Sequence, residues 1–244
     1  MLDTVFRKLG SELSATSRDR LREILGRHKH LRPQEDLQRQ GETRPAAHFV
    51  LEGILCRYTL CGDKRAVLAY LLPGDFCGPL PDFEGLTDHG ISALTPATVA
   101  EVPQLVLQEC LDRSPELAKA LSALFLMEIR IQRQWLANMT MPADKRMAHL
   151  LCELRARLAE VGLADARGFT LPLTQQDLAE ALGISAVHAN RTLQHLKDKG
   201  LARITDRHVV IADLAQLQQF AEFDDGYLAL RPTASPVELQ APVI

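Results

Sequence analysis

The sequence predicts an α+β protein with an N-terminal antiparallel β-roll, one long helix, and a C-terminal domain in which two short helices precede a small hairpin. Three observations support this fold class. Short β-rich runs separated by turn residues occupy residues 31–105. An apolar stripe of helical period follows residue 114. Residues 174–211 then combine a closely spaced helix pair with two short strand-like runs.

The chain has 244 residues, which is enough for two ordinary domains with separate cores. We expect residues 1–113 to form the β-roll domain, 114–140 the long helix and 141–226 the C-terminal domain. Residues 227–244 contain prolines among small residues, which is typical of a flexible tail.

Composition excludes several classes of protein. The chain is 46% hydrophobic and 24% charged, and no apolar stretch approaches the roughly 20 residues that span a bilayer. The first ten residues lack the apolar core of a secretion signal, so we expect a cytoplasmic protein with no membrane partner. We find no glycine-rich phosphate loop, zinc-ligand spacing or local nucleophile motif, and therefore predict that the chain is not an enzyme.

The five cysteines are odd in number and widely spread, which indicates reduced thiols. They occupy positions Cys56, Cys61, Cys77, Cys110 and Cys152. Because none forms a closely spaced pair, we expect no metal and no cofactor.

The N-terminal part is predicted to open with a helix that includes residues 17–28. Strands are expected at residues 48–52, 54–60 and 66–72, because turn residues at 61–64 and 73–75 separate them. This spacing favours a small antiparallel barrel or roll.

The long helix begins at Ser114, a favourable N-cap, followed by Pro115 at the first helical position. Its apolar stripe is interrupted at Glu128. The stripe consists of Leu117, Leu121, Leu124, Ile131 and Trp135. We expect these five side chains to mediate dimerisation while the helix also covers the β-roll; a helix buried within one subunit is the alternative.

The C-terminal helix pair has specific start and stop signals. Thr174 and Asp177 form a capping box at the first helix, Gly183 can adopt the left-handed conformation that ends it, and Ser185 caps the second helix. Residues 203–211 are expected to form a two-stranded wing that turns at residues 206–208.

The outward face of the second helix carries polar residues that are unusual for a solvated helix. Asn and Arg can form paired hydrogen bonds with adenine and guanine edges in the major groove. The candidate base-reading residues are Val187, His188, Asn190 and Arg191. The candidate phosphate contacts are Thr174, Ser185, Lys197, Lys199, Arg203 and Arg207. Two packed helices without a DNA role are the structural alternative.

Residues 173–196, LTQQDLAEALGISAVHANRTLQHL, resemble the DNA-binding signature of the catabolite-activator/Fnr (Crp/Fnr) superfamily. Residues 73–78 resemble the β-roll motif of that family, and residues 148–154 its helix leading into the winged domain. The resemblance implies a cyclic-nucleotide-binding-like β-roll, a dimerisation helix, and a winged helix that reads palindromic promoter sites.

The sequence also departs from the family pattern. Members that bind cyclic AMP hold the ribose with a glutamate and the phosphate with an arginine, where this chain has Pro79 and Ile91. Neither residue can replace those interactions, and acidic residues 82, 84 and 88 lie nearby, so we expect no physiological cyclic AMP binding. Oxygen-sensing members use N-terminal cysteines for an iron–sulfur cluster, whereas the first cysteine here is Cys56. On the recognition helix, Val187 replaces a common glutamate, while Arg191 matches the family's arginine.

These observations predict a homodimer that binds double-stranded DNA at palindromic promoters and recruits or blocks RNA polymerase. The net charge of −3 does not by itself indicate a nucleic-acid partner. The alternative is a ligand or redox sensor that acts through protein partners.

Overall fold

The computed structural model describes residues 2–10, 13–43, 46–62, 64–78 and 86–228. Helices α1 (Leu2–Leu9) and α2 (Ala15–Ile24) open the chain. The helix expected over residues 17–28 ends earlier, because His28 pairs with Ala100 at the start of strand β1. No helix among the described residues is long and apolar enough to cross a membrane.

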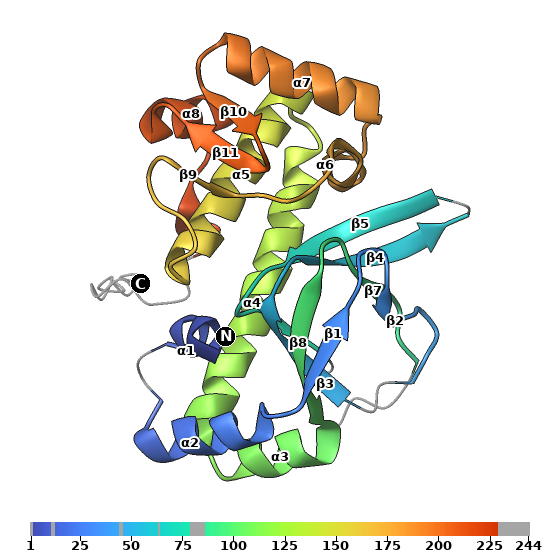
Figure 1. The fold of residues 1–244 in the computed structure, drawn as a ribbon, viewed down its shortest axis with the longest axis vertical. Helices are drawn as coiled ribbons and strands as arrows, with labels where there is room; N and C mark the ends of the chain where they lie inside the picture. Colours follow the sequence, from blue (N-terminus) through green and yellow to red (C-terminus); the bar gives the residue numbers. More distant parts are fainter. Residues whose placement is uncertain (1, 11–12, 44–45, 63, 79–85, 229–244) are drawn as a thin grey trace, which may run out of the picture.

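The N-terminal domain is a β-roll of two four-stranded antiparallel sheets (Figure 1). One sheet has the order β1-β8-β3-β6 and the other β2-β7-β4-β5. The strands are β1 (His28–Leu31), β2 (Asp36–Gln38), β3 (Ala46–Glu52), β4 (Leu55–Cys61), β5 (Lys64–Leu71), β6 (Phe76–Cys77), β7 (Gly90–Ala93) and β8 (Ala97–Pro103). Val50 and Val99 of one sheet and Leu55 and Ile91 of the other belong to one buried cluster, so the sheets share a core.

Helix α3 (Gln104–Asp112) leads into the long helix α4 (Pro115–Asn138). Ser114 accepts a hydrogen bond from the Leu117 amide, and Pro115 stands in the first turn, as the sequence predicts. Helix α4 runs along the long axis of the molecule, with the β-roll beside its first part and the C-terminal domain around its last turns (Figure 1).

The C-terminal domain packs helices around a small three-stranded sheet. Its elements are α5 (Ala143–Glu160), β9 (Gly168–Thr170), α6 (Gln175–Leu182), α7 (Ala186–Asp198), β10 (Ala202–Thr205), β11 (His208–Ile211), α8 (Leu214–Ala221) and the 3-10 turn η1 (Asp225–Tyr227). The wing therefore has one more strand than the sequence indicated, because β9 pairs with β11. The turn between β10 and β11 consists of Asp206 and Arg207, both with positive φ, while His208 already belongs to the strand. The α+β fold class is confirmed.

The segment after α8 returns to the body of the protein. The Tyr227 hydroxyl donates a hydrogen bond to Glu153 (3.0 Å), and the Tyr227 ring stacks on His149. The division expected at residue 227 thus falls inside a packed segment. The remainder of the predicted flexible tail, residues 229–244, lies outside the described residues.

Candidate nucleic-acid interface

Helices α6 and α7 form a helix-turn-helix whose ends are fixed by local hydrogen bonds. Thr174 and Asp177 make the predicted reciprocal capping box at the start of α6. Gly183 ends α6 in the left-handed region at φ 62°, and Ser185 then accepts a hydrogen bond from the His188 amide (3.2 Å). Since both helix starts and the turn are constrained, the angle between the helices is set by the backbone.

The two faces of α7 differ as the sequence predicts. Ala189 and Leu196 are fully buried against α5 and α6, and Leu193 is partly buried. The four candidate base-reading residues are all exposed: Val187, His188, Asn190 and Arg191. Val187 is 64% exposed, which is unusual for valine on a helix and leaves its methyl groups available to a thymine methyl.

Asn190 has a partner that the sequence did not reveal. Its side-chain nitrogen donates a hydrogen bond to Oε1 of Gln175 at the start of α6, with a distance of 2.8 Å. Fifteen residues separate the two positions, and only the angle between α6 and α7 brings them together. No local pattern could have indicated this contact.

The candidate phosphate contacts fall into two groups. Lys197, Lys199, Arg203 and Arg207 are exposed around the end of α7 and on the wing, although the ammonium group of Lys199 lies 5.3 Å from the centre of the Phe220 ring. Thr174 and Ser185 act as N-caps, and the Thr174 hydroxyl also donates to Asp177 (2.7 Å). Their roles in binding phosphate stay predictions. The Thr174 hydroxyl would have to give up its hydrogen bond to Asp177 before it could donate to a phosphate.

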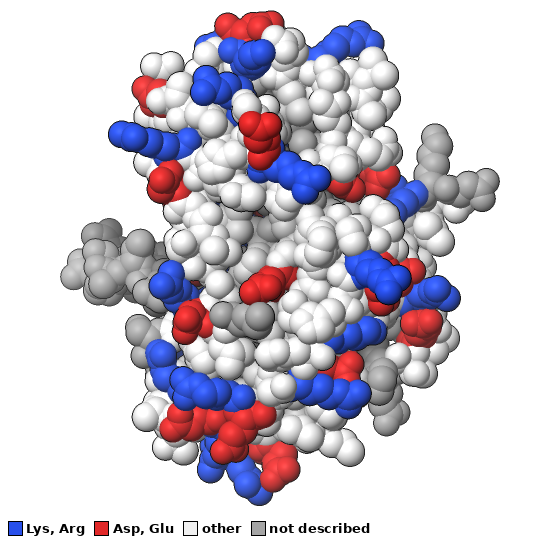
Figure 2. Space-filling view, viewed as in Figure 1, with Lys and Arg blue, Asp and Glu red and all other residues white. Residues whose placement is uncertain are grey.

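The surface charge is mixed. On the face of the molecule drawn in Figure 2, Lys and Arg side chains are interspersed with Asp and Glu at both ends, without one continuous basic patch. This distribution agrees with the net charge of −3. Specific positioning at a DNA backbone would therefore depend on a small number of cations rather than on overall charge.

The helix-turn-helix also contacts the β-roll. The Tyr70 hydroxyl of β5 donates to the Asp177 carbonyl oxygen of α6 (2.9 Å), and Arg65 of β5 lies 3.9 Å from the Glu180 carboxylate. Burial is the main cause that raises the pKa of the Tyr70 hydroxyl, so this hydroxyl stays a donor at neutral pH. The position of α6 thus depends partly on the N-terminal domain.

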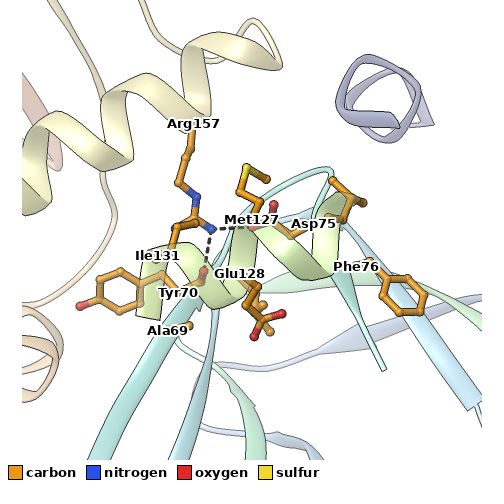
Figure 3. A pocket seen from close by; sticks show the side chains of 10 residues that line it. Ala69, Tyr70, Asp75, Phe76, Met127, Glu128, Ile131 and Arg157 are labelled. Atoms are coloured by element: carbon orange, nitrogen blue, oxygen red, sulfur yellow. Dashed lines mark hydrogen bonds and ion pairs between the residues drawn. The ribbon is translucent and has the colours of Figure 1, made fainter. Parts of the chain in front are cut away.

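A buried cluster of charges lies between the two domains. Figure 3 shows Arg157 of α5 directed toward Asp75 and the Tyr70 carbonyl group at the edge of a cavity. The cavity measures about 20 Å³, which is room for about one water molecule. Arg157 also donates to Glu153 (3.0 Å), whose carboxylate accepts a further bond from the indole nitrogen of Trp135 (2.9 Å).

Of the two positions at which the sequence departs from the cyclic-AMP-binding pattern, residue 91 lies among the described residues. Ile91 is buried, with 1% exposure, and presents no cation. Arg57 of β4 is buried but already forms an ion pair with Glu128 of α4, and it lies 2.6 Å from Nε2 of His89. Pro79 and acidic residues 82 and 84 lie outside the described residues, while Asp88 is exposed.

The predicted dimerisation residues do not form a free surface. Leu117, Leu121, Leu124 and Ile131 are buried in the core that α4 shares with the β-roll and α1–α3. Trp135 is partly buried and bonds to Glu153. This prediction is corrected, because the most regular apolar stripe of α4 packs within its own chain. Exposed apolar side chains of α4 instead include Leu126, Ile129 and Leu136.

Comparisons with known proteins agree with this architecture. Residues 28–114 match the cyclic nucleotide-binding domain, and residues 145–220 match the Crp-like helix-turn-helix domain. The chain is 26% identical over 202 residues to the nitrogen fixation regulation protein FixK of Bradyrhizobium diazoefficiens, covering 82% of this chain and 84% of that protein. It is 24% identical over 216 residues to the fumarate and nitrate reduction regulatory protein of Vibrio cholerae, covering 86% and 84%.

Solved structures show the same fold. FixK2 from Bradyrhizobium japonicum matches with a TM-score of 0.70 at 23% identity, covering 80% of this chain and 96% of that one. CLP from Xanthomonas campestris, described as a c-di-GMP responsive global regulator, matches with a TM-score of 0.63 at 20% identity, covering 81% and 99%. Together with the two matched domains, these similarities show that the chain belongs to the Crp/Fnr family of DNA-binding transcription regulators, which are not enzymes.

Proposed function

We propose that this regulator acts as a homodimer that reads inverted-repeat promoter sites without cyclic AMP, and that it recruits or blocks RNA polymerase there. The observation that carries the proposal is a seam of exposed side chains along α4. This seam differs from the buried stripe on the same helix.

The exposed seam has the period of a coiled coil. Its members alternate in steps of three and four residues, which gives a mean period of 3.5. On α4 they are Lys119, Ser122, Leu126, Ile129, Arg133 and Leu136, and Thr140 continues the spacing just beyond the end of the helix. Leu126, Ile129 and Leu136 are 48%, 43% and 74% exposed, so the seam presents apolar side chains that a second copy of α4 would cover.

A two-fold symmetric pair would present two copies of α7 to DNA. Symmetry requires that the same residues of each copy meet, which a parallel pairing of α4 satisfies. Recognition helices in such dimers enter successive major grooves about 34 Å apart, and the target is then an inverted repeat. Selection from random duplexes would therefore enrich a palindrome.

Independence from cyclic AMP is supported by the charge arrangement between the β-roll and α4. The Arg57 side chain is the cation of β4 in this region, and Glu128 neutralises it. The ion pair also links β4 directly to α4, so the chain itself supplies a cross-connection between them. Calorimetry with cyclic AMP is expected to show no binding, and saturable micromolar binding would contradict this part of the proposal.

Redox sensing through protein partners has less support. Burial raises the pKa of the Cys56 thiol to about 11 and those of Cys77 and Cys152 to about 12. These thiols stay protonated at neutral pH and are poor nucleophiles. Cys61 is exposed on the β4–β5 hairpin.

The decisive experiment is selection of bound sequences from a random duplex pool with purified protein and no added ligand. We expect a palindrome with half-sites about one helical turn apart, and an affinity that falls steeply with salt. No enrichment together with weak salt dependence would contradict the proposal and favour action through protein partners.

A further inference from the structure

We propose that Gln175 is a specificity-determining residue, which holds the Asn190 carboxamide so that its oxygen, rather than its nitrogen, faces the base that Asn190 reads. The inference rests on the proposed function, because it requires Asn190 to lie in a major groove. It adds a residue of α6 to the set on α7 that decides the sequence preference.

The two side chains are adjacent and both are exposed on the surface that contains the recognition residues. Asn190 Nδ2 donates to Gln175 Oε1 at 2.8 Å, a good hydrogen-bond distance. Oδ1 of Asn190 has no hydrogen bond to any described residue, so it is available to accept one. A free asparagine, by contrast, can use both atoms of its carboxamide and pair with the N6 and N7 atoms of adenine.

Gln175 is anchored well enough to impose this orientation. It directly follows the N-cap Thr174, whose hydroxyl is locked in the capping box with Asp177. The Asp177 carbonyl oxygen accepts a further hydrogen bond from Tyr70 of the β-roll. The backbone at the start of α6 is therefore restrained on two sides, and this restraint fixes the position of the Gln175 Cα atom.

The hydrogen bond matters most once DNA is bound. In water an exposed amide pair contributes little, because solvent competes for both groups. A DNA duplex excludes that water, so an Asn190 nitrogen without a partner would then cost free energy. Because one of the two N–H groups of Nδ2 is bound to Gln175, the orientation of the carboxamide is fixed, and the free Oδ1 selects a base that offers an exocyclic amine in the major groove, which means cytosine N4 or adenine N6.

Charge-altering variants separate this role from a general effect on binding. Gln175→Glu keeps an acceptor, so Asn190 should keep its orientation and preference while affinity falls equally for all sequences. Gln175→Lys offers only donors, so Asn190 should turn its oxygen toward the lysine and its nitrogen toward the base. The preference at that one position should then shift to a base with an acceptor, such as thymine O4 or guanine O6.

The test measures affinities of the full chain for duplexes that carry each base pair in turn at every half-site position of the selected palindrome. Asn190→Ala identifies the position that Asn190 reads. Gln175→Ala should weaken preference there by roughly two- to tenfold and leave the Arg191 position unchanged. Gln176→Ala is the matched control, because the side-chain nitrogen of Gln176 donates its hydrogen bond to Glu180 within α6.

The outcomes distinguish the inference from the proposed function. Absence of any enriched palindrome would overturn both. A palindrome whose base preferences are the same for Gln175→Ala and the unmodified chain would overturn the inference alone. A uniform loss of affinity at all positions in the uncharged variant Gln175→Ala would also overturn it, since Gln175 would then be a phosphate contact. A base shift in Gln175→Lys confined to the Asn190 position supports it.

Discussion

The guanidinium group of Arg157 lies 2.7 Å from the carboxylate of Asp75, and the pair joins helix α5 of the winged domain to the turn before β6 in the β-roll. Both side chains are buried. Burial by itself disfavours the charged form of Asp75, but Arg157 and Lys8 together hold the pKa of Asp75 below its ordinary value. The orientation of the DNA-binding domain therefore depends on a buried ion pair whose partners come from different domains.

Removing Arg157 is expected to destabilise the protein. Arg157→Met would leave Glu153 as a buried carboxylate without its cation and Asp75 with Lys8 but without its closer partner. Removing one partner of a buried ion pair typically costs about 3 to 5 kcal/mol. Urea unfolding measures this loss directly. Arg155→Met on the same helix is the control, because Arg155 bonds to the Asp165 carbonyl oxygen at the surface. Similar stability of the two variants would show that the ion pair does not hold the domains together.

The seam of α4 is expected to control the oligomeric state. Ile129→Glu should place a charge in the middle of the seam and dissociate the dimer, because two carboxylates would meet across the two-fold axis. Analytical ultracentrifugation of the variant measures the mass in solution. Leu105→Glu is the matched control, since Leu105 is 85% exposed and belongs to α3, not to the seam of α4. A dimer that persists in Ile129→Glu would place the interface elsewhere.

Sequence patterns predicted the fold well where local physics decides it. The capping box at Thr174, the left-handed Gly183 and the Ser114 N-cap follow from neighbouring residues, and all three are present. The role of the apolar stripe on α4 could not be decided in this way. Periodicity shows that a helix buries one face, but it does not show whether its own chain or a partner covers that face.

Contacts between distant residues were beyond sequence reasoning. Glu128 interrupts the stripe of α4 because it pairs with Arg57, which lies 71 positions earlier in the chain. The bond between Gln175 and Asn190 likewise depends on the angle between two helices. In each case the residue type was visible in the sequence, but the partner was not.

Base-reading and phosphate-binding residues are expected to differ in their effect on specificity. Arg191→Ala should cost roughly 1 to 3 kcal/mol at one symmetric position of the half-site, because it removes a contact to a base edge. Lys197→Ala and Arg207→Ala should instead weaken binding to all sequences alike and lower the salt dependence by about one charge per subunit. Affinities for single-base variants of the site measure both effects. An unchanged sequence preference in Arg191→Ala would remove Arg191 from the set of base-reading residues.

Acidification is expected to destabilise the protein through His149. The imidazole is buried, with the Phe223 ring 5.0 Å and the Tyr227 ring 5.9 Å away, and this burial lowers the pKa of His149 to about 4. The unfolded chain binds a proton near pH 6.5, so the stability that neutral His149 contributes is complete above that pH and is lost as the pH falls toward 4. The loss for this residue amounts to about 3 kcal/mol.

The variant His149→Phe isolates this contribution, because phenylalanine keeps an aromatic ring against Phe223 and Tyr227 but does not titrate. Protonation of carboxylates such as Asp75 also reduces the free energy of unfolding in acid. Both proteins contain these carboxylates, so their effect cancels in the difference between the two free energies. The free energy of unfolding of the unmodified chain should therefore fall relative to that of the variant between pH 6.5 and 4. Parallel stability curves over that interval would mean that His149 is already protonated in the folded protein, or that its ring is accessible to water.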